Sequence, residues 1–156
     1  LIKMDLQGSE LMAIEGGERS FSHAVAVISE VNFAPIYKNG PLFGDIDAAL
    51  RARGFVLHAF ISHGKRDWLP VESKQPNGSF HQLLWADVLY LPDPSRLLEL
   101  SDDRLWSLAF IAHEMTRSFD VALRCIEILS ERTEGASFIG GYAKRIIAEL
   151  QSDDAG

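Results

Sequence analysis

The sequence predicts an α/β fold, and three observations support this prediction. Short apolar runs of strand length alternate with stretches of helical periodicity in the first part of the chain. One of these runs, residues 24–31, begins with five consecutive apolar residues, which is typical of a strand covered on both faces in a parallel sheet. Two further runs, 55–62 and 82–91, follow each other without a helical pattern between them, which favours an antiparallel hairpin.

The first elements are short. Residues 1–6 are expected to form a strand whose apolar run is interrupted only by Lys3. Residues 9–20 have helical spacing, but Gly16 and Gly17 weaken the centre, so we expect a short or broken helix. The strand over 24–31 comes next.

A loop, a helix and a strand follow. Prolines and an Asn-Gly pair mark residues 32–41 as a loop. Residues 42–53 carry an amphipathic stripe, which predicts a helix with Gly54 as its C-terminal stop. Residues 55–62 are the third expected strand, and the polar residues 63–79 are expected to form a loop.

The character of the chain changes after the fourth expected strand, residues 82–91, and the Pro-Asp-Pro breaker behind it. Three helices are predicted over 102–114, 118–131 and 138–151, and residues 152–156 are expected to be a frayed tail. We therefore divide the chain into an α/β part, 1–92, and a helical extension, 93–156.

Composition narrows the classes of function. The chain has 156 residues, 47% hydrophobic, with a net charge of −7, so nucleic acid is a poor default partner for its acidic surface. No apolar run approaches the roughly 20 residues of a membrane helix. The single cysteine, Cys125, cannot form an internal disulfide, which fits a reducing, cytoplasmic compartment. The chain starts at Leu1 rather than methionine, which suggests an upstream extension.

Carboxylates stand where two strands are expected to end. Asp5 follows the first strand, Glu10 falls in the first turn of the next helix, and Glu30 ends the second strand. Ligands of open α/β sheets bind beyond the carboxyl ends of strands, so these acids are candidates for proton transfer. The structural alternatives are a helix cap for Asp5, a backbone cap or dipole contact for Glu10, and a solvated or ion-paired position for Glu30. Three such acids could also hold a divalent cation, although their spacing does not require one, and we predict no metal site.

Four ordered segments of the chain resemble the carboxyl-terminal half of FkbM-type methyltransferases. They are Leu1-Ile-Lys-Met-Asp-Leu-Gln-Gly-Ser-Glu10, Val27-Ile-Ser-Glu30, Tyr37 with Phe43, Ile46, Leu50 and Arg53-Gly54-Phe55, and Ala86-Asp87-Val88-Leu89-Tyr90. The resemblance covers residues 1–92. It implies the later half of a Rossmann-like sheet and an enzyme that transfers a methyl group from S-adenosylmethionine to an oxygen.

The resemblance also implies roles for residues. Asp5 would be the acceptor-side base or orienting group, with Glu30 and Glu10 shaping the polar pocket. Met4, Asp5 and Leu6 would contact the cofactor.

The acceptor would be a small-molecule or glycan hydroxyl, contacted from the loop 32–41 by Phe33, Tyr37 and Lys38. Aromatics and a cation over a strand end suit a sugar or polyol, although ordinary loop packing is an alternative for these residues.

The glycine-rich loop that holds the cofactor in such folds is not in this sequence, because no Gly-x-Gly-x-x-Gly occurs. We therefore expect a fragment of the enzyme. The alternative is a non-catalytic interaction module, since residues 1–6 would leave an apolar sheet edge that could pair with a second copy. A different nucleotide-dependent transferase on the same scaffold also remains open.

Overall fold

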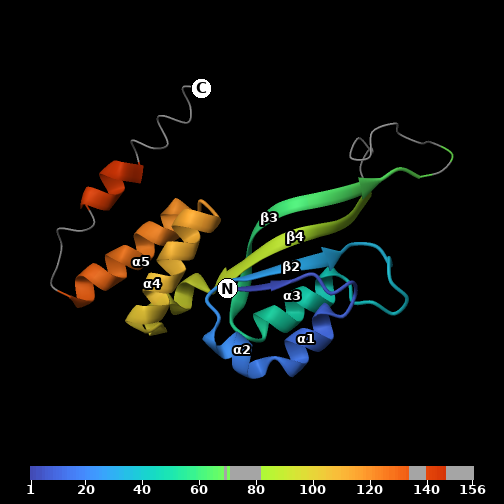
Figure 1. Ribbon diagram of the computed structural model, residues 1–156, viewed down its shortest axis with the longest axis horizontal. Helices are drawn as coiled ribbons and strands as arrows, with labels where there is room; N and C mark the ends of the chain where they lie inside the picture. The colour runs from blue at the N-terminus through green and yellow to red at the C-terminus, as the bar shows by residue number, and fades with distance from the viewer. Residues whose placement is uncertain (69, 71–81, 134–139, 147–156) are drawn as a thin grey trace. The chain divides into compact units, whose positions relative to one another are not determined.

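The computed structural model describes residues 1–68, 70, 82–133 and 140–146 (Figure 1). The chain divides into two compact units, Leu1–Asp93 and Pro94–Gly156. Each unit is described by itself below.

The first unit contains a four-stranded mixed sheet. Its strands are β1 (Ile2–Met4), β2 (Val27–Asn32), β3 (Phe55–Arg66) and β4 (Gln82–Pro92), in the order β1-β2-β4-β3. β1 and β2 are parallel, and β4 is antiparallel to both β2 and β3. The predicted α/β class and the antiparallel hairpin are confirmed. The hairpin folds so that β4 lies between β2 and β3, and β3 becomes an edge strand.

Three helices connect these strands. The predicted helix over 9–20 is broken, as expected, into α1 (Glu10–Gly16) and α2 (Glu18–His23). The predicted helix over 42–53 is α3 (Phe43–Arg51). Its start is fixed by Asp45, whose Oδ2 accepts a hydrogen bond from the backbone N–H of Leu42 at 2.8 Å.

The core of this unit lies between one face of the sheet and the helices. Strand side chains alternate between faces, so every second residue of β2 and β4 faces the helices. These residues form one buried cluster with side chains of α1 and α3: Val27, Val31, Ala86, Val88 and Tyr90 from the strands, and Ile14, Ile46 and Leu50 from the helices. Figure 1 shows α1 and α3 on the same side of the sheet.

β3 is longer than its sequence predicts. The loop expected over 63–79 is wrong for its first residues, because strand pairing continues as far as Arg66 opposite Gln82. These residues are polar, and an edge strand accepts polar side chains since backbone hydrogen bonds rather than burial hold it. Of the remainder of that predicted loop, 69 and 71–79 lie outside the described residues.

Trp85 of β4 lies against Gly64 of β3. A Cβ atom added to Gly64 would lie only 2.2 Å from the indole Nε1 of Trp85. Glycine at this position therefore lets the indole cross the neighbouring strand.

The second unit is helical in its described residues. It contains a 3₁₀ turn, η1 (Pro94–Glu99), then α4 (Asp102–Phe110), a π-helical turn, η2 (Ile111–Met115), and α5 (Phe119–Arg132). The helices predicted over 102–114 and 118–131 are thus confirmed.

One arginine connects the two ends of this helical segment. Arg132 of α5 donates hydrogen bonds to the carbonyls of Leu98 and Leu100 and to Asp102 at the start of α4. Of the predicted helix 138–151, residues 140–146 are helical, and the remainder lies outside the described residues together with the tail 152–156. No helix in the described part of the chain has the length and apolar character to cross a membrane.

Candidate functional site

A row of three carboxylates crosses the sheet on the face opposite the core. Met4 of β1 pairs with Ser29 of β2, so the next residues, Asp5 and Glu30, are neighbours near the carboxyl ends of these parallel strands. The expectation that Glu30 ends its strand is wrong, because pairing with β4 extends β2 to Asn32. Glu30 in turn pairs with Asp87 of β4. We call Asp5, Glu30 and Asp87 the carboxylate row. The predicted proximity of Asp5 and Glu30 follows directly from the parallel pairing.

The row changes the acidity of its central member. The pKa of Glu30 is raised, first because partial burial disfavours its charged form and then because Asp5, Glu10 and Asp87 repel that charge. A carboxylate with a raised pKa accepts a proton more readily near neutral pH. Among the described residues, no group of three or more His, Cys, Asp or Glu side chains is arranged to hold a metal ion.

Asp87 also contacts the edge strand. Its Oδ2 accepts a hydrogen bond of 2.7 Å from the Ser62 hydroxyl of β3. Sequence reasoning missed Asp87 as a site residue, because only the strand register shows that it lies opposite Glu30.

Glu10 holds the turn between β1 and α1. Its side chain is 1% exposed. Oε1 accepts a hydrogen bond from the backbone N–H of Leu6 at 2.7 Å, and Oε2 accepts one from that of Gly8 at 3.1 Å. Both carboxylate oxygens therefore bind the backbone of the turn. This contact resembles the capping alternative, and the catalytic role of Glu10 stays a prediction.

A hydrogen-bonded chain connects Asp5 to the loop after β2. Gln7 donates from Nε2 to Asp5 Oδ1 at 3.0 Å and accepts a hydrogen bond from the Tyr37 hydroxyl at its Oε1. Gly8 has a positive φ of 96°, and an added Cβ would lie 3.0 Å from the Tyr37 ring. Sequence reasoning missed Gln7. The sequence shows Gln7 only as a polar residue in a turn, because its partner Tyr37 lies 30 positions further along the chain.

Tyr37 lies in the electrostatic field of the same acids. Its pKa is raised, first by desolvation and then by the negative charges of Glu30, Glu10 and Asp5. The structure thus brings Tyr37 to the carboxylate row.

Of the other two predicted acceptor contacts, Phe33 packs on the helix side of the sheet, and Lys38 is an exposed loop residue. The Phe33 ring packs with those of Phe43 and Phe60, with ring centres 5.4 and 6.2 Å away. It joins the buried cluster on the helix side of the sheet.

The three predicted cofactor contacts differ in exposure. Asp5 and Leu6 are exposed, whereas Met4 is 4% exposed and belongs to the core cluster. The Met4 side chain therefore packs the core, which leaves its backbone as the part that could face a ligand.

Comparison with protein families gives one match. Residues 1–57 match the family model of the methyltransferase FkbM domain. No curated protein and no solved structure matches the chain. The matched segment contains β1, the turn held by Glu10, β2 and α3, with two members of the carboxylate row. The resemblance to FkbM-type methyltransferases is thereby confirmed for residues 1–57, and it suggests a methyltransferase.

Proposed function

We propose that this chain forms the acceptor side of an S-adenosylmethionine-dependent O-methyltransferase with a Rossmann-like sheet. The carboxylate row is the observation that carries the proposal, because two of its members, Asp5 and Glu30, lie near the carboxyl ends of two parallel strands within the segment that matches the family. The mixed sheet is compatible with part of a methyltransferase fold.

The residues of the row fit one part of the cofactor. S-adenosylmethionine supplies a methyl group bound to positively charged sulfur, and neighbouring carboxylates favour a positive charge. Asp5 and Glu30 would face this sulfonium group. The sequence contains no Gly-x-Gly-x-x-Gly that would hold the nucleoside part. The residues present therefore fit only the positively charged sulfur of the cofactor.

Glu30 is the proton acceptor in this proposal. Its raised pKa suits the removal of a proton from an acceptor hydroxyl as that oxygen becomes the nucleophile. Asp5 is held in place by Gln7 and would orient the hydroxyl. Tyr37 extends the same hydrogen-bonded chain toward the acceptor. Positioning of this kind supplies much of the rate of a bimolecular transfer.

Substitution of the two acids tests the proposal. Full-length protein is incubated with S-adenosylmethionine carrying a labelled methyl group and a panel of sugar, lipid, peptide and polyketide hydroxyl acceptors. Glu30→Gln is expected to lower kcat by about 10²–10⁴-fold, the usual contribution of a general base. Asp5→Asn should lower turnover far more than it lowers stability. Glu15→Gln, on an exposed position of α1, is the control.

Two results would contradict the enzyme proposal. Near-normal turnover by both site variants excludes the assigned roles. Absence of measurable S-adenosylmethionine binding by calorimetry, with a folded protein, argues against the cofactor.

A specific observation favours a second candidate, the interaction module. β1 is an edge strand of the described sheet, and the flanking residues Leu1 and Leu6 are each 44% exposed. An open strand edge can pair with a second copy of the chain. Dimers in size-exclusion chromatography would support this candidate, whereas a stable monomer over the accessible concentration range would contradict it.

A further inference from the structure

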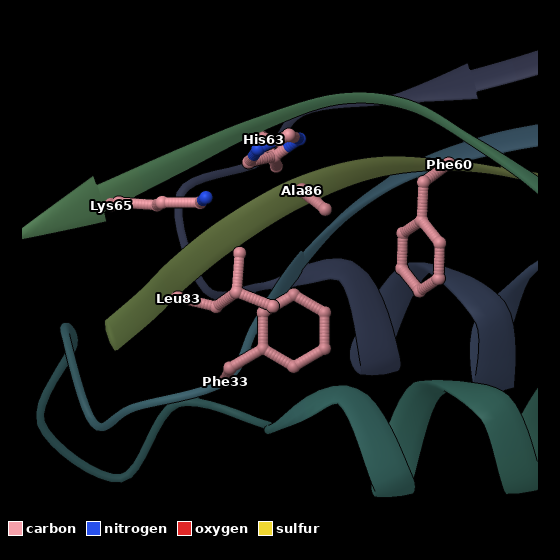
Figure 2. A pocket seen from close by; sticks show the side chains of 6 residues that line it. All are labelled: Phe33, Phe60, His63, Lys65, Leu83 and Ala86. Carbon is pink, nitrogen blue, oxygen red and sulfur yellow. The ribbon is translucent and has the colours of Figure 1, made fainter. Parts of the chain in front are cut away.

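A pocket lies on the helix side of the sheet, away from the carboxylate row. Its volume is ≈ 400 Å³, within the range of roughly 300–1,000 Å³ typical of small-molecule sites. Figure 2 shows the side chains that line it. They come from β3, β4 and the residue after β2: Phe33, Phe60, His63, Lys65, Leu83 and Ala86.

Most of the pocket wall is apolar. Phe33 and Phe60 contribute two aromatic rings, and Leu83 and Ala86 contribute aliphatic side chains. The Phe60 side chain lines the pocket and is nevertheless 52% exposed to solvent. An exposed aromatic side chain at the edge of an apolar pocket is typical of a binding surface.

The polar part of the wall is basic. His63 and Lys65 both come from β3, and Lys65 is partly buried. None of the described residues that line the pocket is acidic. Within the described part of the chain, the Lys65 ammonium group makes no ion pair. An apolar pocket with a cation at its side complements a ligand that has an apolar body and an anionic group.

We propose that this pocket binds an amphipathic carboxylate, with its apolar part against Phe33, Phe60 and Leu83 and its carboxylate at Lys65. The His63 ring can provide a further hydrogen bond to the same group. The proposal does not depend on methyl transfer, because the pocket and the carboxylate row lie on opposite faces of the sheet.

Calorimetric titration of the full chain tests the proposal with ligands that share one apolar chain. Dodecanoate is compared with dodecanol and with dodecyltrimethylammonium, the two ionic ligands below their micelle concentrations and dodecanol below its solubility limit. Saturable binding of dodecanoate is expected, with weaker binding of dodecanol and the weakest of the cation. 2-Naphthoate shows whether a chain or a ring fits better, and tighter binding of either carboxylate supports the proposal.

Variants locate the binding. Lys65→Met keeps the aliphatic stem and should weaken dodecanoate binding by up to about fivefold, as for a partly exposed charge pair, while leaving dodecanol unchanged. Phe60→Ser removes a side chain that is 52% exposed and should weaken both ligands by about tenfold. Lys144→Met, an exposed lysine of the second unit, makes the same chemical change away from the pocket and should have no effect.

Three outcomes would overturn the proposal. They are the absence of saturable dodecanoate binding by folded wild-type protein, equal binding of the cationic ligand, and a Lys65→Met variant that binds dodecanoate like the wild type. Circular dichroism spectra of the variants confirm that each is folded.

Discussion

The two faces of the sheet carry opposite kinds of side chain at neighbouring positions of the same strands. Val31 and Val88 face the helices and are almost completely buried, while Glu30 and Asp87, one residue away, form the carboxylate row. The helix face removes apolar surface from water, which is the dominant favourable term in folding. The other face brings like charges together, which is unfavourable. One face therefore stabilises the unit, and the other carries the charged groups of the proposed site.

The largest expected effect is on the helix face. Leu50 of α3 is completely buried in the core cluster. Leu50→Ala should lower the free energy of unfolding by about 2–5 kcal/mol, because it removes buried methyl groups and leaves a cavity. Urea unfolding measures the change. Met12→Ala, at a position of α1 that is 73% exposed, is the matched control and should change stability by less than about 0.5 kcal/mol. Equal losses in the two variants would show that burial on the helix face does not stabilise the unit.

The turn that ends β1 should show the next largest effect. Glu10→Gln replaces a carboxylate that accepts two backbone hydrogen bonds with an amide that has one acceptor oxygen. The free energy of unfolding should fall by about 1.5–3 kcal/mol, the usual range for hydrogen bonds to a charged group. Denaturant unfolding and hydrogen exchange at the Leu6 and Gly8 amides are the measurements. Glu15→Gln on the same helix should leave both unchanged, and a wild-type-like Glu10→Gln variant would contradict the turn-holding role.

Sequence reasoning located the parts of the site that depend on local rules. Asp5 follows the first expected strand and Glu30 lies near the end of the second, so the two could be predicted as neighbours once two parallel strands were expected. Asp87 could not be identified as their neighbour, because its place depends on the register between β2 and β4. The contact between Gln7 and Tyr37 depends on the path of a whole loop.

The length of β3 and the pocket escaped prediction for a related reason. The polar residues 63–66 form strand because β4 provides hydrogen-bonding partners, which the β3 sequence alone does not show. The pocket combines Phe33 with Lys65 and Leu83, which are brought together only when β4 inserts between β2 and β3.

Close packing between β3 and β4 should give an intermediate effect. Gly64→Ala places a Cβ where the Trp85 indole lies, so the ring must move. We expect a loss of about 1–2 kcal/mol, in the lower part of the usual range for overpacking because the ring is partly exposed. Urea unfolding followed by tryptophan fluorescence reports both the stability and the ring environment. Gly44→Ala on α3 has open space around the new Cβ and should be neutral or stabilising. Identical behaviour of the two variants would exclude the proposed contact.

The smallest expected effect concerns the charge of Glu30 on the open face of the sheet. Because its pKa in the folded protein is raised above the usual 4.5, the folded state binds the proton more tightly than the unfolded state. The protonated carboxyl thus favours folding below about pH 4.5, and this contribution is lost as the pH rises through the raised pKa. At neutral pH the ionised Glu30 should therefore be a cost to stability.

Glu30→Gln removes this titration and should be more stable than the wild type at neutral pH. The gain should be below about 1 kcal/mol, because the side chain is partly exposed and water screens the repulsion. The difference should shrink as the pH falls below 4.5, where the wild-type side chain is neutral too. Urea unfolding at pH 7.5 and at pH 4 measures it. The same substitution is expected to lower turnover. A Glu30→Gln variant that is more stable but less active would show that the Glu30 carboxylate both destabilises the folded state and takes part in the proposed reaction. A Glu30→Gln variant less stable than the wild type at pH 7.5 would show instead that the carboxylate row is held by favourable contacts.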